Sequence, residues 1–460
     1  MTEISGERTH KKTVLVVTTM SSFLTPMALS TVNIALPTIA GEFLMDAITL
    51  SWVATVYILT AAALLVPFGR VADIYGRKKI FIWGTAVFTA SSFLLGIAWS
   101  AGLLIFFRIL QGVGSAMLFG TGIAILSSAF PPGERGRALG INVAAVYLGL
   151  SCGPFLGGVL TQHAGWRSIF LFNVPLGMVI IVFSLWKLRT ERAGSKGEPF
   201  DFVGSFIYCA MLVALMYGFS ILPGMAGTFL IAAGIAGICI FVAWELKTGK
   251  PILDITLFKT NKVFTFSNIA ALIHYSATFA VSFLLSLYLQ QIKGLSPQNA
   301  GAVLISQPLV QAVFSPIAGR MSDRIEPRVV ASTGMSLTAA GLFLLTFLEA
   351  GTDTWFIISA LALLGFGYAL FSSPNTNAIM SSVENRFFGV ASSMLGTMRL
   401  LGQAFSMGIA MMAFALYIGA VEIVPQHYPM LMKSITTVFT VFGFLCTGGI
   451  FASLIRGNLR

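Results

Sequence analysis

Long apolar runs separated by short polar segments form the dominant pattern along this chain of 460 residues. Each run holds roughly 18 residues or more, which is enough for one helix to cross about 30 Å of hydrocarbon. The runs lie at residues 13–40, 51–69, 80–98, 101–126, 138–161, 168–186, 203–222, 227–245, 263–291, 299–319, 329–348, 354–377, 388–418 and 432–455. The pattern therefore predicts an all-α polytopic membrane protein with 14 transmembrane helices.

Composition agrees with this pattern and excludes a soluble domain. Hydrophobic residues make up 56% of the chain and charged residues only 10%, whereas about a quarter of the residues in a soluble globular protein are charged. The four cysteines all fall inside apolar runs and lack metal-ligand spacing. We therefore expect neither a disulfide framework nor a metal site. The first apolar run is too long for the core of a cleaved signal peptide, so no such signal is expected.

The basic residues are distributed unevenly between the two sides of the predicted helices. If the N-terminus is cytoplasmic, 23 of the 28 Lys and Arg fall in cytoplasmic loops or at the termini. Only Arg167, Lys293 and Lys433 lie on the outer side, and Arg108 and Arg399 lie within spans. This asymmetry follows the positive-inside rule and predicts that both termini are cytoplasmic. It also explains the net charge of +11 without a nucleic-acid partner.

An internal repeat divides the chain. The loop "VPFGRVADIYGRKK" (66–79) returns in degraded form as "SPIAGRMSDRIEPR" (315–328). Gly69, Arg70 and Asp73 map at an offset of 250 onto Gly319, Arg320 and Asp323. Two related halves are typical of secondary transporters, which bind substrate near the bilayer midplane between the repeats. We predict a 6 + 2 + 6 arrangement, with a bundle at 1–190, two extra helices and their linkers at 191–260, and a second bundle at 261–460.

These motifs give the chain a resemblance to the major facilitator superfamily, and within it to the fourteen-span drug:proton antiporters. The loop "GRVADIYGRKK" is the most specific match, and in that family it is a cytoplasmic gate latch. The resemblance assigns this latch role to Gly69, Arg70, Asp73, Gly76 and Arg77.

Further motifs carry the same resemblance. "RILQGVGSAM" places Arg108 inside the fourth span, with Gln111 on the same helix face. A guanidinium at the bilayer centre is costly and normally faces a cavity or a partner; the alternative is that Arg108 lies near the span end and reaches water. "WRSIFLFNVPLG" resembles a signature of the fourteen-span group. "GLSCGPFLGG" resembles the antiporter motif, with its members at Gly149, Gly153, Pro154, Gly157 and Gly158.

The chain lacks the membrane-embedded carboxylate that drug:proton antiporters usually carry. None of its 17 acidic residues falls near the middle of a span. In the first span the family's acid stands five residues before an asparagine, and here that position is Ala28, before Asn33. Electrostatics then favour neutral, zwitterionic or anionic amphiphiles over dications. If transport is coupled to protons, the candidates are Asp73, Arg108 and His274, the last because histidine titrates near neutrality.

Polar and aromatic residues within the spans are candidates for a substrate cavity. They are Asn33, Gln111, His274, Tyr275, Gln307, Gln311, Phe371, Asn375, Asn377 and Arg399. The alternative for each amide is hydrogen bonding between helices, and for His274 a hydrogen-bonded place in the interior. The 19 methionines and 39 phenylalanines suit an adaptable apolar cavity but are common in any membrane protein.

The combined expectation is an exporter of hydrophobic or amphiphilic compounds that works by alternating access, with proton antiport as its energy source. A lipid or organic-anion carrier, a flippase or a uniporter of the same fold is the first alternative, and a non-transporting sensor or scaffold is the second. We expect no enzymatic activity, because no Ser/His/Asp set, metal cluster or nucleotide loop is found. We also expect no cofactor, a monomeric state, and a location in a prokaryotic cytoplasmic (inner) membrane.

Overall fold

The fold is known from a computed structural model, which describes residues 2–130, 132–188, 199–222, 224–249, 251–253, 256–322, 324–383, 388–419, 421 and 423–457. The first part of the chain forms α1 (Thr2–Phe43), α2 (Ala47–Tyr75), α3 (Arg77–Gly96), α4 (Ala101–Ala129), α5 (Pro132–Ala164), α6 (Arg167–Leu171) and α7 (Asn173–Lys187). Next come α8 (Phe202–Ser220), α9 (Met225–Glu245) and α10 (Thr256–Thr260). The last part forms α11 (Lys262–Ser276), α12 (Val281–Leu287), α13 (Pro297–Leu304), α14 (Ser306–Ser322), α15 (Pro327–Leu344), α16 (Thr354–Ser381), α17 (Phe388–Tyr417) and α18 (Tyr428–Ile455).

Several helix boundaries follow from local capping chemistry. The Asp46 carboxylate accepts hydrogen bonds from the amides of Ile48 and Thr49, both at 2.9 Å, and so starts α2. Ser100 and Asp353 cap α4 and α16 in the same way. Gly76 separates α2 from α3 with a φ of 107°, a conformation that residues with a Cβ rarely adopt. Short polar loops therefore turn the chain between consecutive helices.

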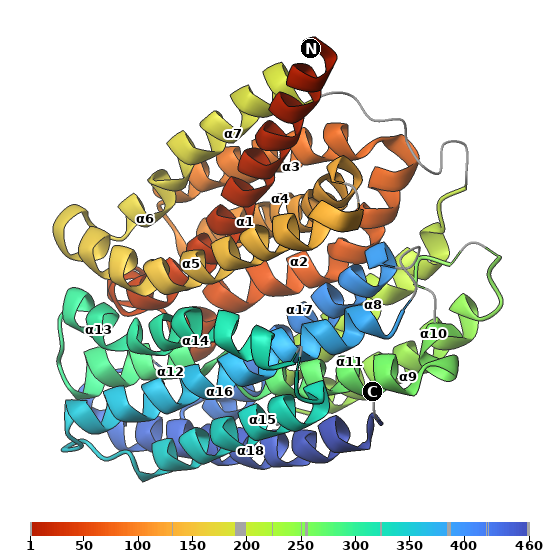
Figure 1. Cartoon of the computed structure of the whole chain (residues 1–460). Coiled ribbons are helices and arrows are strands. Elements are labelled where there is room, and N and C mark those ends of the chain that lie inside the picture. The colour runs from red at the N-terminus through yellow and green to blue at the C-terminus, as the bar shows by residue number, and fades with distance from the viewer. Residues whose placement is uncertain are drawn as a thin grey trace.

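The helices form two groups that pack against each other (Figure 1). Helices α1 to α7, here called the N-terminal half, occupy the upper part of the view, and α11 to α18, the C-terminal half, occupy the lower part. Helix α5 contacts α13 and α14, and α2 contacts α17, so these helices form much of the interface between the halves. Helices α8 and α9 pack on each other, and α8 also contacts α2 and α17 from the side.

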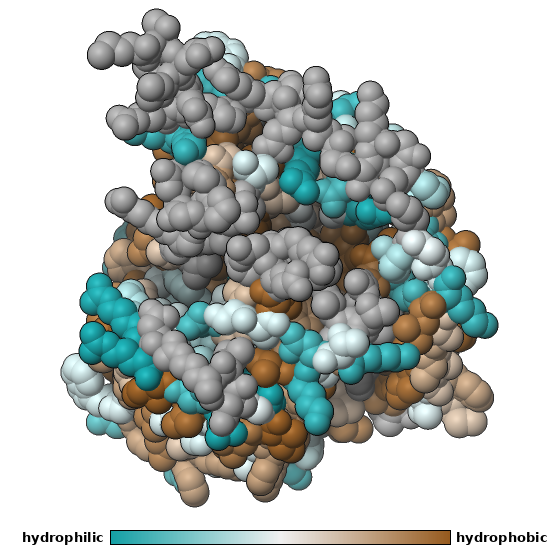
Figure 2. All heavy atoms as spheres, turned by 45° about the vertical axis from the view of Figure 1, so that its right-hand side comes forward, coloured by the Kyte–Doolittle hydropathy of each residue, from teal (hydrophilic) through white to brown (hydrophobic). Residues whose placement is uncertain are grey.

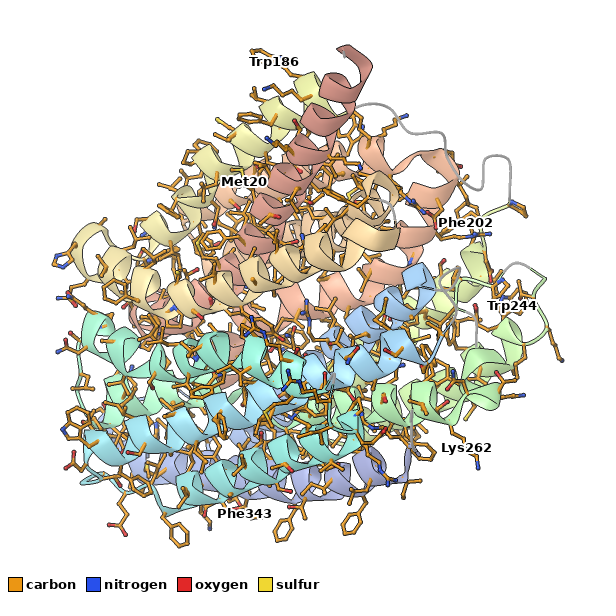
Figure 3. The ribbon with its side chains drawn as sticks, viewed as in Figure 1. Met20, Trp186, Phe202, Trp244, Lys262 and Phe343 are labelled. Atoms are coloured by element: carbon orange, nitrogen blue, oxygen red, sulfur yellow. The ribbon has the colours of Figure 1, made fainter. Side chains whose placement is uncertain are left out.

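The outer surface of the bundle is apolar, as a hydrocarbon environment requires. Trp186 on α7 and Phe202 on α8 point away from the protein in Figure 3 and are 82% and 75% exposed. Figure 2 shows hydrophilic residues gathered over the end that comes forward, and hydrophobic residues along the flank below them. This distribution is that of a multi-pass membrane protein.

Thirteen helices in the described part of the chain are long and apolar enough to cross a membrane. They correspond to thirteen of the runs predicted from the sequence. The remaining run, predicted at 203–222, forms α8, a helix of 19 residues that is apolar over Phe202–Gly218. The fold class is therefore confirmed, and the run predicted at 203–222 is also helical.

One predicted span is an interrupted helix. The run at 263–291 leaves the helical path between α11 and α12 and ends in a π-helical turn, Tyr288–Ile292. The boundaries at Ile305, between α13 and α14, and at Phe172, between α6 and α7, are not breaks, because both residues keep helical dihedrals and the i→i−4 hydrogen bonds continue. Hydropathy did not detect the break after α11 because an apolar window stays apolar when one turn unwinds.

Arg456 is buried, whereas the sequence predicted that it is solvated. The charge count assigns it to the solvated C-terminus, but its side chain is only 1% exposed at the end of α18. Its guanidinium donates to Oδ1 of Asn375 at 3.0 Å and to Oγ of Ser267 at 3.3 Å. The C-terminal half thus encloses a third arginine that the hydropathy pattern had excluded from the interior.

Candidate functional site

A cavity lies between the two halves and has about 1190 Å³ of atom-free space, including its opening. Helices of both halves line it. The polar and aromatic residues in its wall are Thr25, Ser30, Asn33, Tyr57, Phe119, Tyr147, His274, Tyr275, Thr278, Phe279, Ser282, Gln307, Gln311, Tyr368, Ser372, Arg399 and Gln403.

The break between α11 and α12 forms part of the cavity wall. His274 and Tyr275 lie in the last turn of α11, and Thr278 lies in the unwound segment that follows. The freed amide of Ala280 donates to Oγ of Ser406 at 3.0 Å, so α17 replaces the lost helical hydrogen bond. Irregular backbone at this depth is tolerated only where protein or a cavity satisfies its polar groups.

His274 stands in an aromatic cage. Its ring stacks on Phe371 with centroids 4.1 Å apart, and Tyr368 and Tyr275 approach it edge-on at 5.1 Å and 5.7 Å. The side chain is 2% exposed, yet within the described residues its Nδ1 has no hydrogen-bond partner. Phe371 therefore supports the cavity from behind His274 and does not itself line it.

Two glutamines on α14 lie together on the cavity wall. Nε2 of Gln307 donates to Oε1 of Gln311 at 3.0 Å. They lie on either side of Pro308, whose carbonyl accepts a hydrogen bond at 3.1 Å from Ser151 on α5. This bond joins the two halves next to the predicted amide pair.

Arg399 on α17 reaches across the interface. Its guanidinium carbon lies 5.8 Å from the centroid of the Phe119 ring on α4. Among the described residues of the cavity wall, it is the single formally charged side chain at neutral pH. Nε of Arg399 and Oε1 of Gln403, one turn further along α17, are buried without a hydrogen-bond partner in the described part of the chain.

The N-terminal half contributes Asn33 on α1 and Tyr57 on α2. Asn33 is 3% exposed, and its Oδ1 is also unpartnered among the residues that the structure describes. The Tyr57 hydroxyl donates to Oγ of Ser115 at 2.8 Å. Behind this ring, 4.4 Å from its centroid, lies the guanidinium carbon of Arg108.

Arg108 is fully buried in the N-terminal half. Its Nε donates to the carbonyl of Val53 at 2.9 Å and its Nη1 to Oε1 of Gln111 at 2.5 Å; Gln111 in turn donates to Oγ of Ser92 at 2.8 Å. The alternative of a side chain reaching water from a span end is therefore wrong. Neither Arg108 nor Gln111 lines the cavity; Tyr57 separates them from it.

Other sequence candidates also lie away from the cavity wall. Asn375 is 1% exposed and binds the carbonyl of Ser267 and the Arg456 guanidinium. Asn377 donates to Oγ of Ser322 at 2.9 Å. Both amides join helices within the C-terminal half. Ala28, where the family's acid is missing, is 1% exposed and is not part of the wall.

The predicted latch motif lies at the turn between α2 and α3. Asp73 and Arg77, near this turn, form an ion pair at 2.8 Å, with both side chains about one-third exposed. A Cβ built at Gly69 would meet nothing within 4 Å. A Cβ built at Gly120 of α4 would approach the Gly69 backbone, so α4 passes close to α2 here. Asp323, the counterpart of Asp73 in the second repeat, lies outside the described residues.

The antiporter motif on α5 joins α5 to α1 and to the other half. A Cβ built at Gly149 would lie 2.4 Å from the carbonyl oxygen of Phe23, and one at Gly157 would lie 2.7 Å from that of Thr31. A Cβ at Gly153 would lie 1.7 Å from the side-chain Oγ of Ser30 on α1. Gly158 instead faces Pro297, the first residue of α13, and Pro154 faces Gly301 of α13 while also lining the cavity.

Apart from Tyr275, sequence reasoning missed the aromatic residues of the cavity wall. Tyr57, Phe119, Tyr147 and Tyr368 line the cavity or enclose its polar groups, but no motif distinguishes them. In a chain with 39 phenylalanines and 10 tyrosines, an aromatic residue in a span is not informative by itself. Gln403 had a usable signal, because it lies four residues after Arg399 on one helix face.

Comparison with known proteins identifies the architecture. The sequence model of the Major Facilitator Superfamily matches residues 18–243 and 267–458. The riboflavin transporter RibZ of Clostridioides difficile is 33% identical over 404 residues, which cover 87% of each chain. The multidrug resistance protein Stp of Mycobacterium tuberculosis is 29% identical over 413 residues, which cover 88% of this chain and 76% of Stp.

A third relative is the multidrug export protein EmrB of Escherichia coli, 27% identical over 404 residues that cover 85% of this chain and 77% of EmrB. The family match extends over both halves and over the helices that form the cavity between them. RibZ is named a transporter and EmrB an export protein, and the Major Facilitator Superfamily is a family of transporters and not of enzymes. The chain therefore belongs to the Major Facilitator Superfamily and is a multi-pass secondary transporter of a small molecule.

Proposed function

We propose that this transporter exports hydrophobic or amphiphilic compounds from a prokaryotic cytoplasm by alternating access, with both termini on the cytoplasmic side of the inner membrane. The observation that carries the proposal is the cavity between the halves, with walls from α1, α2, α4 and α5 on one side and α11, α14, α16 and α17 on the other. A substrate held by both halves can be exposed to either side when one half rocks against the other.

Hydrogen bonds between the two halves at the predicted outer end support alternating access. Ser286 and Gln290 donate to the carbonyls of Asn33 and Ile34 at 2.6 Å and 3.0 Å. These bonds join the two halves beyond the cavity. The drug-resistance and export names of several relatives support export as the direction of transport.

Proton antiport is the proposed energy source. Of the three coupling candidates, Asp73 is paired with Arg77, Arg108 is enclosed behind Tyr57, and His274 alone lines the cavity. If coupling does not involve His274, a His274→Ala variant retains transport that depends on the pH gradient. Loss of that dependence, with substrate binding retained, would assign the coupling to His274.

The experiment that tests the proposal has two parts. A susceptibility panel of cationic, neutral and anionic amphiphiles, in a host without its own efflux pumps, is expected to show resistance conferred by this chain. Proteoliposomes then measure proton movement driven by the compound with the strongest effect. If cells that express the chain are no more resistant than cells with an empty vector, and the vesicles show no counterflow, export is contradicted and a sensor or scaffold is supported.

A carrier that does not couple to protons is the second candidate. The cavity wall, as far as the structure describes it, contains no carboxylate, and Ala28 replaces the family's usual acid. RibZ, the relative at 33% identity, is named for riboflavin, which extends the candidate cargoes to organic compounds other than drugs. Transport that is indifferent to the pH gradient in the same vesicles would favour this candidate over antiport.

A further inference from the structure

The charge and hydrogen-bonding groups of the cavity specify a narrower class of substrate than export alone requires. We infer that the site binds planar aromatic compounds as monoanions that also carry a hydrogen-bond donor, with the anionic group at Arg399. The physiological meaning of this inference rests on the proposed transport function. The binding itself can be measured without transport.

Arg399 provides the positive charge. It enters the cavity wall from α17, and no described carboxylate lies within ion-pair distance of it. Its guanidinium approaches the face of Phe119, but this contact leaves the in-plane N–H donors available, and Nε has no partner in the described structure. A guanidinium in a low-dielectric site attracts an anion that can accept from its planar donors.

The same charge disfavours a cationic substrate. A like charge near Arg399 is repelled, and the described wall offers no Asp or Glu to compensate. The position that holds an acid in related antiporters is Ala28, which is buried behind the wall. A neutral ligand would leave the arginine unpaired, whereas a monoanion pairs with it directly.

Three further polar atoms indicate what else the ligand must offer. Oδ1 of Asn33, Oε1 of Gln403 and Nδ1 of His274 belong to side chains that are 3%, 8% and 2% exposed and line this cavity. None has a hydrogen-bond partner among the described residues. Buried polar atoms are almost always satisfied, and the two amide oxygens are acceptors. All three atoms are closed to solvent in this conformation, so a ligand hydroxyl or ring N–H would supply the missing donor after the wall adjusts around the ligand.

The aromatic wall accounts for the planar part. Tyr57 and Phe119 come from the N-terminal half, and Tyr275, Phe279 and Tyr368 from the C-terminal half. His274 is itself held in place by stacking on Phe371. Aromatic faces favour offset stacking or edge contacts with a flat ring system. A flexible lipid chain would gain none of this geometric selectivity.

The test uses three probes on one scaffold: 6-hydroxy-2-naphthoate, its neutral amide 6-hydroxy-2-naphthamide, and 2-naphthoate, which lacks the hydroxyl. Binding is measured by equilibrium dialysis with the full chain in nanodiscs of phosphatidylcholine. We expect the hydroxynaphthoate to bind about 10- to 100-fold more tightly than its amide, the range of a charge-assisted hydrogen bond. We expect 2-naphthoate to bind more weakly than hydroxynaphthoate.

Arg399→Gln should remove the preference for the acid while leaving binding of the amide near its wild-type value. Arg399→Lys should retain part of the preference, because it keeps the charge but not the planar donors. Lys247→Gln, which removes an exposed basic residue after α9, is the control and should change nothing. Amide binding reports correct folding of each variant.

If Arg399→Gln does not fold, Gln403→Glu tests the same point, since a carboxylate one turn away should neutralise Arg399 and weaken binding of the acid more than binding of the amide. Equal affinities for the acid and the amide, or a preference that survives Arg399→Gln, would overturn the inference. Transport of these probes in proteoliposomes separates it from the proposed function. Selective binding without transport contradicts export, and transport without charge preference contradicts the inferred substrate class.

Discussion

At the residue scale, the three arginines that lie inside the helix bundle, Arg108, Arg399 and Arg456, differ in what surrounds them. Arg108 has backbone and amide partners in the N-terminal half, and Arg456 has Asn375 and Ser267 in the C-terminal half. Arg399 alone stands on the cavity wall. Two guanidiniums therefore hold helices together, and the third is available to a ligand.

Asn375 should be important for stability because it accepts from the buried Arg456 guanidinium. Replacing it with leucine leaves part of a buried charge without an acceptor, which we expect to cost about 1.5–3 kcal/mol. The measurement is the thermal unfolding midpoint of the detergent-solubilised protein. Thr376→Val on the same helix, which removes only a local bond to the Ser372 carbonyl, is the matched control. A midpoint for Asn375→Leu at or above that of the control would show that Arg456 does not depend on this contact.

At the element scale, the close crossing of α1 and α5 positions one wall of the cavity. The carbonyl oxygen of Phe23 leaves no room for a Cβ at Gly149, and Thr31 leaves none at Gly157. Thr25, Asn33 and Tyr147 reach the cavity from these two helices. The glycines thus set the distance between the helices that present polar and aromatic groups to a ligand.

Gly149→Ala should separate α1 from α5, because the obstacle is backbone and cannot rotate away. Overpacking of this kind costs about 1–3 kcal/mol, and we expect transport to fall with little change in membrane insertion. Gly448→Ala in α18 is the control, since nothing lies within 4 Å of its added Cβ. Efflux assays at matched expression decide the comparison, and equal efflux by the two variants would argue against a role for this crossing.

At the scale of the whole molecule, the halves are joined at the predicted outer end. Nε2 of His163 in α5 lies 3.2 Å from Oε1 of Gln298 in α13, and Gly158 faces Pro297 beside them. The amide of Ala47 donates to the carbonyl of Val421 at 3.2 Å. Alternating access requires these contacts to separate in each cycle.

A covalent link at this end should therefore stop transport. Cysteines at positions 163 and 298, in a background without Cys152, Cys209, Cys239 and Cys446, can be joined by a short bis-maleimide that contains a disulfide. We expect crosslinking to abolish efflux and reduction to restore it, while a single cysteine is unaffected. Full efflux by the crosslinked protein would mean that this end does not open during transport.

The sequence by itself determined the membrane class, the helix positions and the internal repeat, because hydropathy and charge act over whole segments. It also indicated Asn33, His274, Tyr275, Gln307, Gln311 and Arg399, which the structure brings to one cavity. Their roles in transport remain predictions. Tertiary structure decided which polar residues face that cavity and which, like Gln111 and Asn377, bind neighbouring helices. It also buried Arg456 at the end of an apolar run. The physical reason is that residue type fixes the cost of burying a polar group, whereas its orientation and partners depend on how distant helices pack.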